Sequence, residues 1–205
     1  TAAAARADIR QRAIVVDEAR RTALLKHLVQ GGGNERALVF VASQYATEHV
    51  ADKLRRAGLS AAAFHGGLSQ GARVGTLEDF KAGRLQVLVA TDMAARGLHI
   101  DALPLVVNYD LPRAAEDYVH RIGRTGRAGG QGDAVSFVPP AAEAHFRLIE
   151  KRQGQRVPRE TLAGFEPATA APPPEQGAGT GLDPHGGVKG KRPSKKDKLR
   201  EAAAQ

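Results

Sequence analysis

The sequence has no cysteine among its 205 residues, so neither a disulfide nor a thiolate metal site can form. It has no signal peptide and no apolar run near the roughly 18 residues that a membrane-spanning helix needs. These absences predict a reducing, cytoplasmic setting and no membrane partner. The chain begins with Thr1 rather than Met, so we expect it to be part of a longer protein.

The chain also lacks a phosphate-binding loop of the form Gly-x-x-x-x-Gly-Lys-Ser/Thr. The stretch "IVVDEARR" at 14–21 resembles a strand that ends in a Mg²⁺-binding acidic pair, but such a pair would need that loop upstream. We interpret Asp17 and Glu18 as acidic residues at a helix start, where they favour the helix dipole. We therefore predict no metal site in this chain.

The net charge of +8 is concentrated near the C-terminus, where residues 189–200 contain seven Lys or Arg and one Asp. Such a tail fits RNA or DNA, and it fits a solubilising end equally well. Six of the 11 prolines lie between Pro167 and Pro193, which is typical of a flexible linker. Length and composition allow one domain of about 150 residues plus a tail. The expected segments are an extension from a missing first domain (1–7), a folded domain (8–164), and a linker with a basic tail (165–205).

Short apolar runs alternate with helical patterns along most of the chain. The expected strands are 9–17, 36–42, 61–65, 85–91, 105–110 and 133–139, and the expected helices are 19–30, 44–58, 69–83, 114–123 and 141–153. Ser69 and Gly83 are expected to cap the two ends of their helix. This alternation predicts an α/β fold with a mostly parallel sheet and helices on both faces. Functional residues are expected where the strands end, at Ser43, His65–Gly66 and Thr91–Asp92.

The stretch "HGGLSQGAR" at 65–73 places two glycines between a strand and a helix. Glycine lets a ligand approach the backbone, and a helix start offers free N–H groups to a phosphate. Gln70 and Arg73 share one face of that helix. The simpler interpretation is a tight turn followed by a solvated arginine.

The stretch "ATDMAARGLHI" at 90–100 leaves a buried strand through Thr91 and Asp92. A threonine hydroxyl beside backbone N–H groups suits a phosphate oxygen, and the short turn that follows projects Arg96. The simpler interpretation is an ordinary loop that Asp92 caps. Taken alone, His99 is more often structural than functional.

The stretch "HRIGRTGRAGG" at 120–130 spaces arginines three residues apart and interleaves them with glycines. Gly123 and Gly126 loosen the helix end, so Arg124 and Arg127 can project from a loop. A planar guanidinium binds phosphate oxygens through two parallel hydrogen bonds. Two such groups can hold a terminal phosphoryl group opposite a Mg²⁺ site and act as arginine fingers. A basic helix end that favours its dipole is the alternative, and it leaves the glycine spacing unexplained.

Together, "LVFVAS", "HGGLSQGAR", "VLVATDMAARGLHI" and "YVHRIGRTGRAG" resemble the C-terminal, RecA-like helicase domain of bacterial DEAD-box ATP-dependent RNA helicases in order and spacing. The resemblance covers residues 8–153. The histidine of "HRIGRTGR" favours this family over the RecQ-type DNA helicases, which have glutamine there. "GFEP" and the basic tail look like the RhlE subfamily, whereas "RGLHI" looks more like RhlB.

The resemblance implies a three-layer RecA-like domain that closes with a first domain on ATP and single-stranded RNA. It implies RNA backbone contacts at Ser43, Gly66, Gln70, Arg73 and Thr91. It places five residues in the ATP cleft: Arg96, Gly97, His99, Arg124 and Arg127. Arg124 and Arg127 would be catalytic arginine fingers. It implies coupling to the first domain through Asp92, His120 and Arg121. The departure is His99, because most of the family has an aspartate there that contacts the ribose.

The resemblance therefore predicts the second half of an ATP-dependent RNA helicase, with the Mg²⁺ ligands in the absent N-terminal domain. The full-length parent would hydrolyse ATP, whereas this chain alone would be inactive. Expected partners are RNA, bound without sequence preference, the chain's own N-terminal domain, and ribosomal or RNA-degradation assemblies. The alternative is a stand-alone RecA-like module that binds RNA or protein without ATP turnover.

Overall fold

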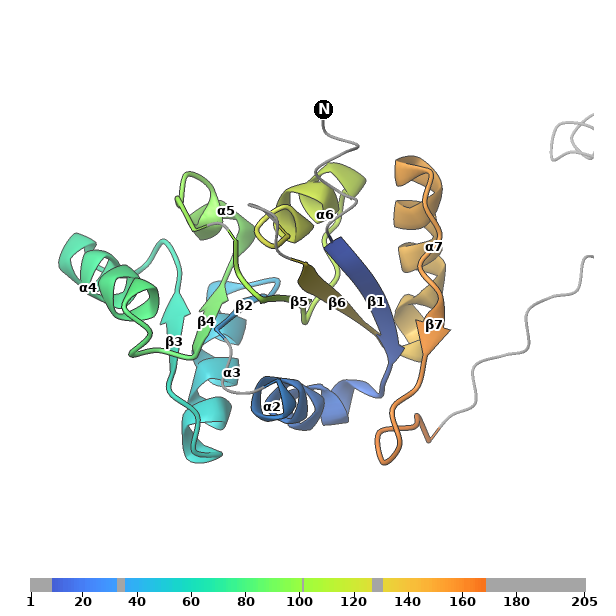
Figure 1. The fold of residues 1–205 in the computed structure, drawn as a ribbon, viewed down its shortest axis with the longest axis horizontal. Coiled ribbons are helices and arrows are strands. Elements are labelled where there is room, and N and C mark those ends of the chain that lie inside the picture. The colour runs from blue at the N-terminus through green and yellow to red at the C-terminus, as the bar shows by residue number, and fades with distance from the viewer. Residues whose placement is uncertain (1–8, 33–35, 101, 127–130, 169–205) are drawn as a thin grey trace, which may run out of the picture. The chain divides into compact units, whose positions relative to one another are not determined.

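The computed structural model describes residues 9–32, 36–100, 102–126 and 131–168. Seven strands form one sheet in the order β3-β4-β2-β5-β6-β1-β7, and every pair of neighbours is parallel (Figure 1). The strands are β1 (Ile9–Val15), β2 (Ala37–Phe40), β3 (Ala61–Phe64), β4 (Val87–Ala90), β5 (Leu105–Asn108), β6 (Gly132–Val138) and β7 (Arg159–Glu160). The predicted α/β fold with a parallel sheet is confirmed.

Helices cover both faces of the sheet (Figure 1). They are η1 (Glu18–Arg20), α2 (Arg21–Gly31), α3 (Gln44–Arg56), α4 (Gln70–Lys81), α5 (Asp92–Ala95), α6 (Ala115–Ile122), η2 (Pro140–Ala142) and α7 (Glu143–Gln153). Helices α2 and α3 share one apolar core with the sheet. On the opposite face α4 and α5 contribute to a second core, and α6 and α7 contribute to a third. The central strands are buried on both sides, which explains their continuous apolar sequences.

Three helices that each follow a strand have a hydroxyl side chain as their N-cap. Ser43 accepts a hydrogen bond from the Ala46 N–H at the start of α3, and Ser69 accepts one from Ala72 at the start of α4. Thr91 does the same for Ala94 at the start of α5, at 3.4 Å. The expected caps of the 69–83 helix are confirmed, because Gly83 follows α4 with a φ of 77°. All three capped ends face the carboxyl edge of the sheet.

Beyond the expected elements, the structure contains two short ones. The turn expected after Thr91 is a four-residue helix, α5, and the last strand, β7, pairs with Ala13 and Ile14 of β1. Past β7 the ring of Phe165 packs against His27, with ring centroids 5.4 Å apart. Among the described residues, no helix combines the length and the apolar character needed to cross a membrane.

Candidate functional site

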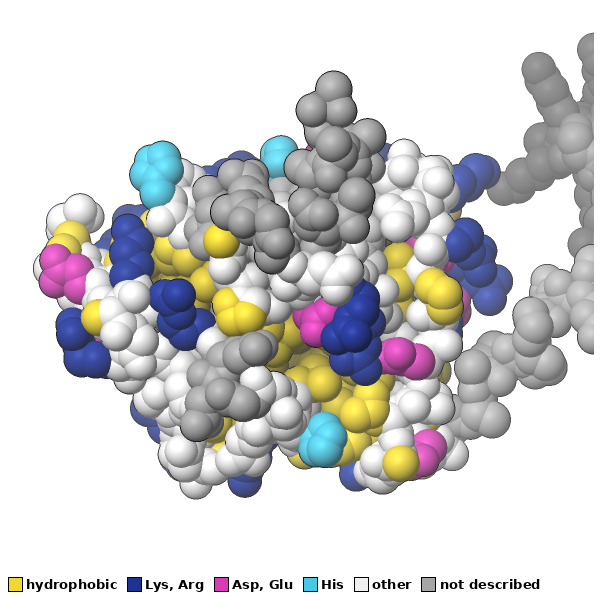
Figure 2. Space-filling view, viewed as in Figure 1, with side chains coloured by type: hydrophobic (Ala, Val, Ile, Leu, Met, Phe, Trp, Pro, Cys, Tyr) yellow, Lys and Arg dark blue, Asp and Glu magenta, His cyan; other side chains and the backbone are white. Residues whose placement is uncertain are grey.

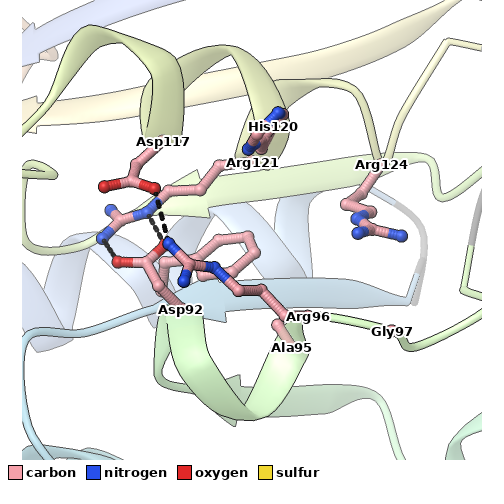
Figure 3. Close-up of a pocket in the computed structure, with 9 residues that line it drawn as sticks. Asp92, Ala95, Arg96, Gly97, Asp117, His120, Arg121 and Arg124 are labelled. Carbon is pink, nitrogen blue, oxygen red and sulfur yellow. Dashed lines mark hydrogen bonds and ion pairs between the residues drawn. The ribbon is translucent and has the colours of Figure 1, made fainter.

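A cavity of about 250 Å³ opens at the carboxyl edge of the sheet, between α5 and α6 (Figure 3). The described residues that line it are Phe40, Asp92, Ala95, Arg96, Gly97, Asp117, His120, Arg121 and Arg124. Three of them are arginines, which come from segments as far apart in sequence as Arg96 and Arg124. The strand order creates this convergence, because α5 follows β4 and α6 follows β5, with only β2 between the two strands.

Arg121 forms the rigid wall of the cavity. Its Nε and Nη2 atoms each donate to one carboxylate oxygen of Asp92 at 2.6 Å, which is the forked geometry of a strong ion pair. Its Nη1 atom donates to the Asn108 side chain at 3.2 Å and to the Asp110 carbonyl at 2.6 Å. Only 2% of Arg121 is exposed. Its donors are therefore occupied within the domain, and its role there is to hold α5 and α6 together.

The surroundings of Arg121 are themselves fixed. Asn108, at the buried end of β5, donates through Nδ2 to the Ser136 hydroxyl at 3.0 Å. The Phe40 ring lies 4.9 Å from the Arg121 guanidinium carbon, a cation–π distance. This support was absent from the sequence prediction. The only local signal was a polar residue, Asn108, ending an otherwise apolar strand.

The other two arginines reach the cavity from its rim (Figure 3). Arg96 donates to Asp117 at 3.2 Å, and two-thirds of its side chain is exposed. Arg124 donates to the carbonyl of Leu98 at 2.8 Å. Both contacts are weaker than the Arg121–Asp92 ion pair. The Arg96–Asp117 pair is exposed to solvent, and the Arg124–Leu98 hydrogen bond joins a guanidinium to a neutral carbonyl. Asp117 is a further cavity residue that the sequence prediction missed.

The remaining residues expected in the ATP cleft have different positions. Gly97 lines the cavity and has a φ of 78°, a left-handed conformation that favours glycine. His99 is exposed and is not among the lining residues. His120, which was expected to couple the domain to the first domain rather than to contact ATP, is exposed and lines the cavity. Arg127 lies outside the described residues.

The residues expected to contact RNA follow three neighbouring strands, β2, β3 and β4. Ser43 and Thr91 are helix caps whose oxygens accept a backbone N–H, which leaves the hydroxyl hydrogen free to be donated to a phosphate. Gly66 and Gln70 are exposed at the turn into α4. Arg73 lies over the Phe64 ring, with its guanidinium carbon 5.4 Å from the ring centroid.

A second cavity, of about 220 Å³, lies at the opposite edge of the sheet, beside α2 (Figure 2). Leu105 and Val135 are the apolar strand residues that line it. Its arginines are held by carboxylates, since Arg10 binds Asp133 through two hydrogen bonds of 2.6 Å and Arg12 binds Glu160. These pairs are part of the sheet edge. Within the described ranges, no group of three or more His, Asp or Glu residues could hold a metal ion.

A parallel sheet covered on both faces, with an arginine-lined cavity at its carboxyl edge, agrees with the RecA-like α/β class, to which the similarity to a solved DEAD-box protein assigns the chain. The family described as "Helicase conserved C-terminal domain" matches residues 20–129, which is more than half of the chain. The chain belongs to this family, as its resemblance to DEAD-box RNA helicases predicted.

The relatives agree with this membership. The ATP-dependent RNA helicase RhlB of Pseudomonas syringae is 40% identical over 154 residues, 75% of this chain and 39% of the relative. The E. coli DEAD-box protein SrmB, solved bound to regulator of ribonuclease activity A, is 34% identical with a TM-score of 0.74 over 80% of this chain and 96% of that one. S. cerevisiae Dbp5, solved bound to RNA and ADP BeF3, is 33% identical with a TM-score of 0.69 over 75% of this chain and 42% of that one. The chain thus spans about two-fifths of the RhlB relative's length.

Proposed function

We propose that the chain is the second half of an ATP-dependent RNA helicase and acts by binding the RNA backbone and contacting ATP held by a first domain. The observation that carries this proposal is the convergence of Arg96, Arg121 and Arg124 on one cavity at the edge where three helix caps also lie. One edge of the sheet thereby offers both guanidinium groups for a polyphosphate and hydroxyl groups for an RNA backbone.

The cavity residues suit the phosphates of ATP better than they suit a metal. Arg96 can exchange its ion pair with the partly buried Asp117 for phosphate oxygens, and Arg124 can do so with its hydrogen bond to the Leu98 carbonyl. The carboxylates, in contrast, are engaged: Asp92 with Arg121 and Asp117 with Arg96. The ligands of Mg²⁺ would therefore come from the first domain, where the metal would neutralise phosphate charge during hydrolysis.

On this proposal, Arg124 and Arg127 are the arginine fingers. A guanidinium placed against the charge that develops on the transferred phosphoryl group accelerates hydrolysis by roughly 10³–10⁵. Arg124 follows Arg121 by three residues, so the buried Arg121–Asp92 pair fixes the base from which Arg124 projects.

The RNA would lie across the ends of β2, β3 and β4, held through sugar and phosphate by Ser43, Gly66, Gln70, Arg73 and Thr91. Contacts of this kind carry no base information, so binding would be independent of sequence. Closure of the two domains over ATP would bend one strand in a way that a duplex cannot follow, and a few base pairs would open. Loss of the γ-phosphate would remove the ligand of the arginines and let the domains separate.

The same ion pair links the two sites. Asp92 follows the RNA-facing Thr91, and Arg121 precedes the ATP-facing Arg124. A displacement of Arg124 toward a phosphate would therefore reach Thr91 through two short hydrogen bonds rather than through a flexible loop. In this reading Arg121 couples the domains from within its own domain, and the exposed His120 contacts the first domain directly.

ATP hydrolysis tests the proposal. Purified residues 1–205 should show no ATPase activity above background, with weak and salt-sensitive RNA binding. The parent protein with its first domain should hydrolyse ATP in response to RNA, and Arg124→Ala should lower kcat far more than it raises KM for ATP. Arg113→Ala, an exposed arginine outside the cavity lining, is the matched control. A parent that binds RNA without ATP turnover would instead support a stand-alone binding module.

A further inference from the structure

His65 is a buried histidine that the mechanism above does not use. It follows β3 directly and precedes the glycine pair Gly66–Gly67. Only 9% of the residue is exposed, although it lies at the edge where RNA is proposed to bind. Both of its ring nitrogens have partners, one on each side of the ring.

Those partners determine where the ring carries its proton. The backbone N–H of Gly67 points at Nδ1 with a nitrogen-to-nitrogen distance of 3.1 Å, and a backbone N–H can only donate. Nδ1 must therefore be the unprotonated, accepting nitrogen. The proton of the neutral ring then resides on Nε2, which donates to Glu48 Oε1 of α3 at 2.9 Å. The ring is thus held in one tautomer by two contacts of opposite sense.

The contact between His65 and Gly67 also fixes the glycine turn. On one side the His65 ring holds the Gly67 amide, and on the other the Gln44 side chain packs over the turn. A Cβ at Gly67 would lie 3.0 Å from Gln44 Oε1 and 3.1 Å from the His65 ring, so these two side chains would have to shift by a few tenths of an ångström to admit it. The carbonyl of His65 also accepts the Leu68 N–H at 3.3 Å. The backbone of Gly66 and Gly67 is therefore held in one conformation before any ligand arrives.

The geometry points to His65 as a positioning residue for RNA. Its Nε2-protonated ring, anchored to Glu48, holds the Gly67 amide and so sets the Gly66 backbone and the start of α4 against the RNA strand. This inference rests on the proposed function, since it assumes that this edge binds an RNA backbone. Pre-organisation of this kind lowers the entropy lost when a loop is ordered on binding.

Two substitutions separate the two ring nitrogens. His65→Asn keeps an acceptor near the position of Nδ1 and loses the donor to Glu48. His65→Gln keeps a donor near the position of Nε2 and loses the acceptor for Gly67. If holding the Gly67 amide is what matters, His65→Gln should weaken RNA binding by about five-fold, the value of one hydrogen bond, while His65→Asn stays within about two-fold of the wild type. Gly67→Ala, which displaces the ring without altering it, should resemble His65→Gln.

The measurement is fluorescence anisotropy of a labelled single-stranded oligouridine with residues 1–205 at low salt. His49→Gln, an exposed neighbour of Glu48 on α3, is the control and should bind as the wild type does. Thermal unfolding identifies any variant that is simply unfolded. Hydrogen exchange supplies a readout independent of RNA, since protection of the Gly67 amide should persist in His65→Asn and be lost in His65→Gln. The ¹⁵N resonances of the wild-type ring should show an unprotonated Nδ1 and a protonated Nε2.

The outcomes separate this inference from the proposed function. If the wild-type chain binds no RNA, the proposed function fails and the positioning role fails with it. If the wild type binds RNA but His65→Asn and His65→Gln bind equally well or equally poorly, only the positioning role is overturned. An Nδ1-protonated ring in the ¹⁵N spectrum would overturn it as well, whatever the RNA affinities.

Discussion

Arg121 and Asp92 are joined by two hydrogen bonds of 2.6 Å although 29 positions separate them in the sequence. The pair fastens the end of α6 to the start of α5, and the guanidinium is almost fully buried. A buried ion pair adds little relative to an apolar replacement, but removing one member leaves an uncompensated charge. The integrity of the cavity wall therefore depends on both residues together.

We predict that Asp92→Asn lowers the free energy of unfolding by about 3 kcal/mol, because it leaves the Arg121 charge buried without a counter-charge. Urea denaturation of residues 1–205 measures this loss. Asp117→Asn is the matched control, since it breaks the exposed pair with Arg96 and should cost less than about 1 kcal/mol. Equal losses in the two variants would show that burial of Arg121 does not determine its contribution.

A second prediction concerns acid stability and the buried carboxylate of Glu150. Burial opposes its ionisation, but hydrogen bonds from Arg159 and from the Val157 N–H outweigh burial and lower the pKa of Glu150 below its ordinary value of 4.5. A carboxyl whose pKa is lower in the folded than in the unfolded state stabilises the fold above the unfolded pKa. That stabilisation is lost as the pH falls through the folded pKa.

Glu150→Gln should therefore reduce the free energy of unfolding by about 2 kcal/mol at pH 7, because it removes a charge-assisted acceptor. The difference from the wild type should shrink once the pH falls below about 4.5, where the wild-type carboxyl begins to lose its advantage. Urea denaturation at several pH values tests this. A difference that stays constant from pH 7 to pH 3 would exclude the ionised carboxylate as the source of the stability.

The sequence predicted the larger elements because burial leaves a periodic signal in it. Continuous apolar runs indicated β2, β4 and β5, and Ser69 with Gly83 indicated the ends of α4. The two-residue strand β7 left no such signal, because its pairing with β1 depends on a contact between distant segments. Helix α5 is a single turn, too short to produce a helical period.

In the cavity, too, residues with a local sequence signal were predicted, and residues that depend on contacts between distant segments were missed. Arg96 and Arg124 were predicted from local patterns and Gly97 from the family resemblance, and all three line one cavity in the structure. Asn108 and Phe40 were missed because they reach Arg121 only through the strand order. The burial of Arg121 was not predictable either, since a charged residue in a basic helix end is usually solvated and its partner Asp92 lies on another helix.

A third prediction concerns the basic stretch at 189–205, which lies outside the described residues. Its deletion removes seven Lys or Arg side chains from the parent. If the stretch contacts RNA, fewer counterions are released on binding, so the affinity should fall and its dependence on salt should become shallower. RNA affinities measured across a salt series check this, and ATP affinity should barely change. An identical salt slope after deletion would assign the stretch a solubilising role.

The last prediction concerns His99, where most of the resembling family has an aspartate. An aspartate can accept hydrogen bonds from both ribose hydroxyls, whereas a neutral imidazole has one acceptor and one donor. His99 is exposed next to Leu98, whose carbonyl holds Arg124, so its side chain has room to turn toward a nucleotide or away from it. A ribose contact by His99 would therefore be a single hydrogen bond, and the protein should discriminate weakly between ATP and 2′-deoxy-ATP.

His99→Asp in the parent should sharpen that discrimination by about 1 kcal/mol, or about five-fold in kcat/KM, because one hydrogen bond to the ribose is gained. His99→Asn is the control: it has the shape of aspartate but supplies one neutral acceptor, so it should leave the discrimination close to the wild-type value. The measurement is RNA-stimulated hydrolysis of the two nucleotides under identical conditions. Equal use of ATP and deoxy-ATP before and after His99→Asp would mean that the side chain points away from the nucleotide and packs near Ile100. The ribose would then be recognised, if at all, by the first domain alone.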